Sequence, residues 1–185
     1  MATRTRDGED AAINLYCQQM GDVQISRPLG SVPPDAIIKH QDGRFEWIEV
    51  TSVWLGQTQN KHASFAKAVN NCSSYEGTFD YHFPNGYWKA IHADLIYSIK
   101  KKDEKVGYQT LLKEYGKGIL ILNLEDPYYA SDLTQIDIST DFSEELNCFK
   151  SVFLHLSALH EWSGGSIQSY PSRLLPVSTS KKKKD

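Results

Sequence analysis

The spacing of apolar residues near the start of the chain predicts a helix over residues 7–20. Ile13, Tyr16 and Met20 lie three and four positions apart, which places them on one helical face. Gly21 follows at a position where helices commonly end in a left-handed turn. Glu9 lies on the same face as the apolar residues, and a carboxylate there is costly unless something compensates it.

The pattern then changes to one typical of strands. Strands are predicted at residues 23–26, 35–40 and 45–54. The Asp-Gly pair within residues 41–44 favours a tight turn, so the second and third of these strands should form a hairpin. Glu49 shares a face of the third strand with Trp47 and Val53, where a charged group needs a partner or a function.

The rest of the chain alternates between helical and strand patterns. Helices are predicted at residues 60–75, 90–102 and 106–114, the last of them ending near Gly116. Strands are predicted at residues 79–83, 87–89, 118–124, 151–156 and 166–170, the last two on either side of a Gly164-Gly165 turn. The run Gly118–Leu124 is almost entirely apolar, as in a strand buried on both faces. This order predicts an α/β fold with a mixed sheet core flanked by helices.

The composition is that of one globular domain with an irregular end. Of the 185 residues, 40% are hydrophobic and 23% are charged, which suits a single domain that we place at residues 1–176. Residues 177–185 are expected to form a disordered, lysine-rich tail. Removing the final four lysines and one aspartate reduces 20 basic and 23 acidic residues to 16 and 22. The acidic body argues against a protein that coats nucleic acid by bulk charge.

Several other classes of protein and site are disfavoured. No apolar run approaches the roughly 18 residues of a membrane-spanning helix, and the N-terminal segment lacks an apolar signal core, so we expect a cytoplasmic protein without a membrane partner. Cys17, Cys72 and Cys148 are far apart and form no CxxC pair, which disfavours a disulfide framework or thiolate zinc site. His155 and His160 have no third ligand at suitable spacing and are expected to be structural.

The most informative segment is Pro34-Asp35, followed after 13 residues by Glu49-Val50-Thr51. Two carboxylates on adjacent strands of a hairpin can meet at one point at the edge of a sheet. A hard divalent cation such as Mg²⁺ takes carboxylate and backbone oxygens and keeps positions for water and phosphate. Asp35 and Glu49 are therefore candidate metal ligands, with the Val50 carbonyl as a further one.

This arrangement resembles the PD-(D/E)XK nuclease superfamily, whose fold is shared by many restriction endonucleases. In that family a proline-aspartate at the start of one strand is followed by an acidic-x-lysine triplet on the next. Pro34-Asp35 matches the first part, Glu49-Val50 matches most of the second, and Glu9 stands where the family often carries a metal-associated glutamate. The resemblance covers roughly residues 9–124. It implies a restriction endonuclease-like core that binds Mg²⁺ or Mn²⁺.

The chain departs from the family pattern at Thr51, where the family has lysine. A neutral hydroxyl is a poor replacement for a charge that orients the attacking water and stabilises the transition state. Thr51 remains in the candidate catalytic set with Asp35 and Glu49. Lys61, at the start of the helix predicted over residues 60–75, is expected to supply the missing cation.

One basic stretch lies within the body of the chain, formed by Lys100, Lys101, Lys102 and Lys105. These lysines are candidates for contacts with the phosphates of a nucleic acid. They are equally consistent with a solvated helix end, where lysines interact favourably with the helix dipole.

Two functions follow from these observations. The first is a metal-dependent nuclease that hydrolyses phosphodiester bonds, with DNA as the expected substrate. The second is a catalytically inactive module with the same fold that recognises a protein or nucleic acid. A protein partner, or a second copy of the chain in a homodimer, is the other partner class that we consider.

Overall fold

The computed structural model describes residues 7–28, 33–53, 87–124, 136–138, 145–156, 159–163 and 166–178. The first part of the chain contains helix α1 and three strands: α1 (Asp7–Met20), β1 (Val23–Ser26), β2 (Ala36–His40) and β3 (Phe45–Val53). The middle part contains α3 (Tyr87–Asp103), the 3₁₀ helix η2 (Val106–Tyr108), α4 (Gln109–Tyr115) and β4 (Gly118–Leu124). The remaining strands are β5 (Ile136–Asp137), β6 (Phe149–Leu156), β7 (Leu159–Ser163), β8 (Ser166–Tyr170) and β9 (Arg173–Ser178).

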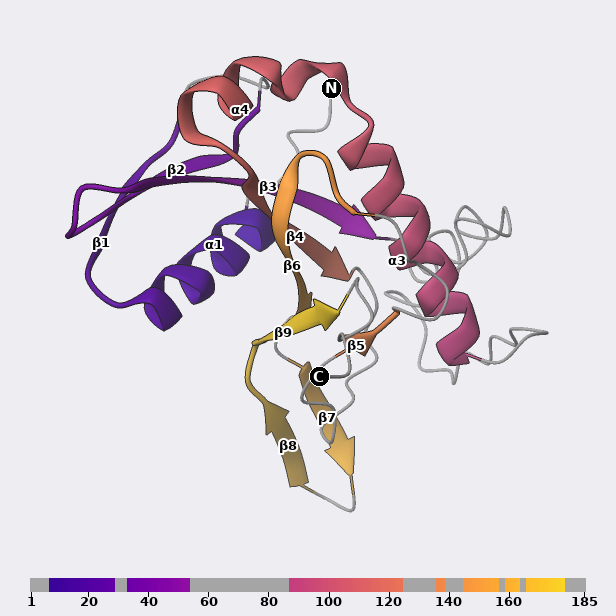
Figure 1. Ribbon diagram of the computed structural model, residues 1–185. Coiled ribbons are helices and arrows are strands. Elements are labelled where there is room, and N and C mark those ends of the chain that lie inside the picture. The colour runs from indigo at the N-terminus through magenta and orange to yellow at the C-terminus, as the bar shows by residue number, and fades with distance from the viewer. Residues whose placement is uncertain are drawn as a thin grey trace, which may run out of the picture.

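Among the described residues, seven strands form one mixed sheet in the order β1-β2-β3-β4-β6-β9-β5 (Figure 1). Strands β1, β2 and β3 are antiparallel neighbours, whereas β4 is parallel to both β3 and β6. Strand β9 is antiparallel to β6, and β7 and β8 form a separate hairpin. The α/β class predicted from the sequence is confirmed.

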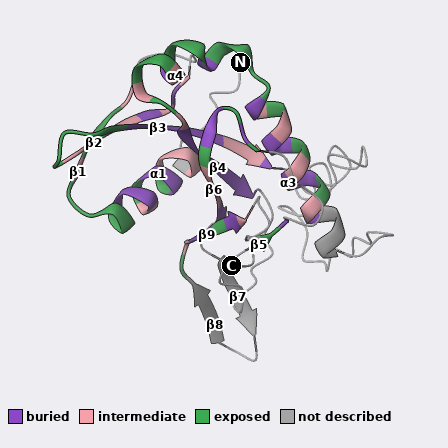
Figure 2. Ribbon diagram, viewed as in Figure 1, coloured by how far each residue is buried: buried purple, intermediate pink, exposed green. Residues whose placement is uncertain are grey.

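Helices cover both faces of the sheet (Figure 1). On one face α1 packs Ile13 and Tyr16 against Ile48 and Ile121. On the other face, α3, η2 and α4 enclose a larger core. Its members include Trp47, Leu95, Ile99, Tyr108, Leu120, Leu122 and Phe149. Strand β4 lies between the two layers and is buried along its whole length (Figure 2), as its apolar run predicted.

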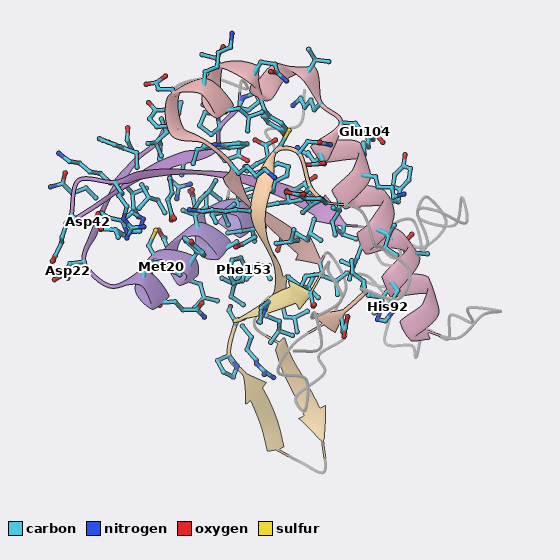
Figure 3. The ribbon with its side chains drawn as sticks, viewed as in Figure 1. Met20, Asp22, Asp42, His92, Glu104 and Phe153 are labelled. Atoms are coloured by element: carbon cyan, nitrogen blue, oxygen red, sulfur yellow. The ribbon has the colours of Figure 1, made fainter. Side chains whose placement is uncertain are left out.

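The helix and hairpin predictions for the first part of the chain are confirmed. Helix α1 has the predicted bounds, and Gly21, which directly follows it, has a φ of 82°. The β2–β3 turn uses Gly43 with a φ of 83°, a conformation that glycine adopts without a Cβ penalty. Figure 3 shows Asp22 and Asp42 at this outer end of the sheet, where Gln41 Nε2 donates to Asp22 Oδ2 at 3.1 Å.

Close packing between β3 and β4 depends on a glycine. Trp47 on β3 donates from its indole N–H to the Gly116 carbonyl at 2.8 Å. A Cβ built on Gly118 would lie only 2.4 Å from the Trp47 ring. The tryptophan therefore occupies the space that a side chain at position 118 would need, and it also packs on Tyr108 and Phe149 at ring distances of 5.2 and 5.3 Å.

Three sequence predictions of secondary structure require correction. Residues 87–89, predicted as a strand, form the first turn of α3, because a run this short fits a helix as well as a strand. The partner of β8 is β7, which we had not predicted, while β6 pairs with β4 and β9. Strand β9 includes Val177 and Ser178, which the sequence had assigned to the tail, and Val177 is buried in the core.

Other predicted elements lie outside the described residues, namely the helix over 60–75 and the strand over 79–83. In the described part of the chain, no helix is long and apolar enough to cross a membrane.

Candidate metal and phosphate site

Asp35 lies immediately before β2 and is held by two contacts with β3. Its backbone N–H donates to the Ile48 carbonyl at 3.0 Å, and its carboxylate Oδ2 accepts the Val50 N–H at 2.7 Å. The paired ladder of β2 and β3 ends at Ala36 and Ile48, so Asp35 lies just beyond it and contacts β3 through Ile48 and Val50. These contacts hold Asp35 against β3, where the charge of Glu49 acts on its carboxylate.

Glu49 lies in the middle of β3 with only 4% of the residue exposed. Its Oε1 atom accepts a hydrogen bond from Lys102 Nζ at 2.6 Å, and this contact is also an ion pair. Its Oε2 atom is buried and, among the described residues, has no hydrogen-bond partner. A buried carboxylate oxygen without a good hydrogen bond is costly.

The Tyr108 hydroxyl adds a second buried polar atom close to Glu49. Burial and then the neighbouring Glu49 raise the pKa of Tyr108 well above its ordinary value, so the hydroxyl stays protonated. A hydrogen bond to Glu49 contributes to this shift, so the hydroxyl lies next to that carboxylate, although among the described residues the contact is poorer than a normal hydrogen bond. The Tyr108 hydroxyl is therefore a protonated donor that faces the Glu49 carboxylate.

The electrostatic environment of Asp35 is that of a crowded carboxylate. Burial raises the pKa of Asp35 to about 6, and the hydrogen bond from Val50 N–H opposes this effect. The charges of Glu49 and Glu9 raise this pKa further, whereas the ammonium of Lys102 lowers it. These four charged side chains therefore share one electrostatic environment. Such a shift is typical of functional sites, where like charges are held close together.

Glu9 reaches this region from α1 across a pocket of about 240 Å³. The pocket is lined by Glu9, Asp10, Asn14, Arg27, Pro28, Pro34 and Asp35. Arg27 pairs with Asp10 at 2.9 Å on one wall. Within the described ranges no three His, Cys, Asp or Glu side chains are grouped closely enough to hold a metal ion. Glu9 consequently faces Asp35 across a space rather than completing a compact cluster of three carboxylates.

The other predicted site residues lie in different positions. Val50 contributes its N–H to Asp35, as described above. Thr51 is half-buried and lines a second pocket with Lys101, Lys102 and Lys105. Lys61 lies outside the described residues, so its predicted role as the missing cation stays a prediction.

The four lysines predicted to bind nucleic acid differ in exposure and in their partners. Lys102 turns inward to Glu49, Lys100 is half-buried, and Lys101 and Lys105 are exposed. Sequence reasoning missed Lys102 as the partner of Glu49. The signal was present in the helical spacing of Leu95, Ile99 and Lys102, which places the lysine on the buried stripe of α3.

Comparison with known proteins does not assign the chain to a family. No family model matches the chain, and neither a curated protein nor a solved structure gives a significant match.

Proposed function

We propose that the protein is a metal-dependent nuclease that hydrolyses phosphodiester bonds in DNA, built on a restriction endonuclease-like core. The contact between Lys102 Nζ and Glu49 Oε1, at 2.6 Å, carries the proposal. The resemblance in sequence lacks a lysine at position 51, and α3 supplies an ammonium group to the same carboxylate from another element. Asp35, Glu49 and Lys102 then form the catalytic set.

Two observations support a divalent cation at this site. Glu49 Oε2 is buried without a hydrogen-bond partner in the described part of the protein. The pKa of Asp35 is raised to about 6 by burial, with Glu49 and Glu9 adding to the increase, and a cation would relieve this repulsion. Oxygen ligands of this kind suit Mg²⁺ or Mn²⁺. Asp35 and Glu49 would hold the ion, with Glu9 contributing through water and the Val50 carbonyl as a further ligand.

The residues of the chain divide the work of hydrolysis. When bound, the cation supplies polarisation of the scissile phosphate and lowers the pKa of a bound water. The Val50 N–H orients the Asp35 carboxylate, and Lys102, beside Glu49, would stabilise the negative charge that develops on the phosphate. The ionised form of Asp35 is required, so metal affinity should fall below pH 6 as protons compete for this carboxylate.

Cleavage of labelled single-stranded and duplex DNA with Mg²⁺ or Mn²⁺ tests the proposal. Glu49→Gln and Lys102→Met should each lower the single-turnover rate by roughly 100-fold or more, the scale expected when a charge-stabilising group is removed. Lys113→Met is the matched control, because Lys113 is an exposed lysine on α4 away from the site, and it should retain the wild-type rate. A wild-type rate in Glu49→Gln would rule out the proposed site.

The binding module remains the second candidate because the same ion pair favours it. Lys102 already neutralises Glu49 without a metal, which is sufficient for a purely structural pair. Calorimetric titration with Mn²⁺ at pH 7.5 separates the two candidates. Heat of binding that disappears in Asp35→Asn supports the nuclease, whereas no binding by the intact protein supports the module.

A further inference from the structure

A second pocket, of about 290 Å³, lies beside the Glu49–Lys102 pair. It is formed between β3 and the C-terminal half of α3. Its walls are Thr51, Ser52, Tyr97, Ser98, Lys101, Lys102 and Lys105, and we call it the lysine pocket. The lining therefore combines three lysine ammonium groups with the hydroxyl groups of one threonine and two serines. Lysine, serine and threonine are the side chains that commonly contact phosphate oxygens.

The charge of the lysine pocket is not cancelled by the acidic residues next to it in sequence. Asp103 directs its carboxylate to the segment before β6, where it accepts the N–H groups of Asn147 at 2.8 Å and Cys148 at 2.7 Å. Glu104 lies beyond the end of α3 (Figure 3) and is not part of the pocket lining. Lys101 and Lys105 are exposed and, in the described ranges, pair with no carboxylate. With Lys102 paired to Glu49, Lys101 and Lys105 give the pocket a net positive charge within the described part of a protein whose body is acidic.

Aromatic rings hold two of these ammonium groups near the pocket. Lys101 Nζ lies 5.7 Å from the centre of the Tyr97 ring, and Lys105 Nζ lies 5.4 Å from that of Tyr108. Contacts of this kind restrict a long side chain without neutralising its charge. The two lysines are consequently partly ordered before any ligand arrives, which lowers the entropic cost of binding.

The position of the pocket relates it to the proposed reaction. Thr51 follows Glu49 by two residues on the same face of β3, a distance of roughly 7 Å along the strand. This is about the separation of successive phosphates along one nucleic-acid strand. We infer that the lysine pocket binds the backbone phosphate next to the scissile one, and this inference rests on the proposed nuclease function.

Binding and cleavage measured separately test the inference. Fluorescein-labelled duplex and single-stranded oligonucleotides are titrated with the full chain in EDTA, so that binding is observed without cleavage. The double variant Lys101→Gln/Lys105→Gln should bind about 10-fold more weakly, and the slope of log K against log salt should decrease by roughly 0.7–0.9 for each lost contact. Lys113→Gln removes one positive charge on α4, compared with two in the double variant, and it should bind as the wild type does.

The outcomes distinguish this inference from the nuclease proposal. With Mg²⁺ present, the double variant should raise KM and leave kcat unchanged, because Lys102 and both carboxylates remain. Weaker binding by the double variant together with no cleavage by the wild type would retain the phosphate pocket and remove the nuclease. Wild-type affinity in the double variant, or a lowered melting temperature with unchanged affinity, would overturn the pocket and leave the lysines as a helix-dipole feature.

Discussion

At the scale of single residues, Asp35 is the position where folding and function oppose each other. The fold partly buries its carboxylate and places it near Glu49 and Glu9, which raises its pKa to about 6. When a carboxyl group has a higher pKa in the folded protein than in the unfolded one, the folded protein loses stability as pH rises through the interval between the two pKa values. The protein thus carries a destabilising charge at neutral pH, which is common at functional sites.

Asp35→Asn should stabilise the protein without metal at pH 8. The amide can still accept the Val50 N–H, while the charge that raises the free energy of the folded state is removed. We expect a gain of about 1–2 kcal/mol in the free energy of unfolding, after allowing for solvent screening of this half-buried group. Urea unfolding at pH 4 and pH 8 measures it, and the gain should vanish at pH 4. A loss of stability at pH 8 would show that the Asp35 charge stabilises the fold.

At the scale of elements, the site depends on how β3 and α3 meet. The ion pair between Glu49 and Lys102 joins the centre of the strand to the last turn of the helix, and the exposed fractions of the two side chains are 5% and 20%. Asp103 anchors the same turn by accepting backbone N–H groups at Asn147 and Cys148. The end of α3 is therefore fixed on both sides, which places Lys102 and the lysine pocket beside the carboxylates.

A double-mutant cycle measures the contribution of this ion pair. Lys102→Met leaves Glu49 buried without its cation, and we expect a loss of about 2–4 kcal/mol in the free energy of unfolding at pH 7. The second change, Glu49→Gln, should recover much of that loss in the double variant, because no isolated charge then remains. Additive losses in the cycle, obtained from urea unfolding curves, would mean that the contact carries no coupling energy.

At the scale of the whole molecule, buried polar groups on the α1 side make the protein sensitive to acid. His155 donates from Nδ1 to Asn123 Oδ1 at 2.7 Å, and burial lowers the pKa of this histidine to about 4. Burial alone would raise the pKa of Glu46, but Lys150 and His40 lower it overall. Both groups stabilise the folded state near neutral pH, and this stabilisation is lost as pH falls. The pKa of Asp35 is raised instead, so its effect on stability has the opposite dependence on pH.

Acid destabilisation should therefore depend on His155. Its unfolded form binds a proton near pH 6.5 while the folded form stays neutral until about pH 4, so the wild type should lose stability across that interval. In His155→Gln, which can still donate to Asn123, this loss should be smaller by roughly 2–3 kcal/mol. Melting temperatures between pH 4 and 7 provide the test. An unchanged slope would show that the histidine is not held neutral, and Asp35→Asn should steepen the slope.

Local patterns predicted much of the fold, and less of the site. Turn chemistry at Gly43 and periodicity in residues 7–20 depend on neighbours in sequence, so α1 and the β2–β3 hairpin were predictable. Residues 87–89 were misassigned because a short aromatic run suits a strand as well as a helix. Strand β7 was not predicted, because its five residues are too few to show a clear strand pattern.

The sequence by itself determined the α/β class, the buried strand β4 and the two carboxylates on one hairpin, since each follows from spacing along a few neighbouring residues. Only the tertiary structure decided which cation meets Glu49. Lys102 is 53 residues away, and its contact depends on the packing of the apolar stripe of α3 against the sheet. The same packing created the lysine pocket between β3 and α3. Contacts between distant segments arise from the summed burial of many side chains, and no short motif encodes that sum.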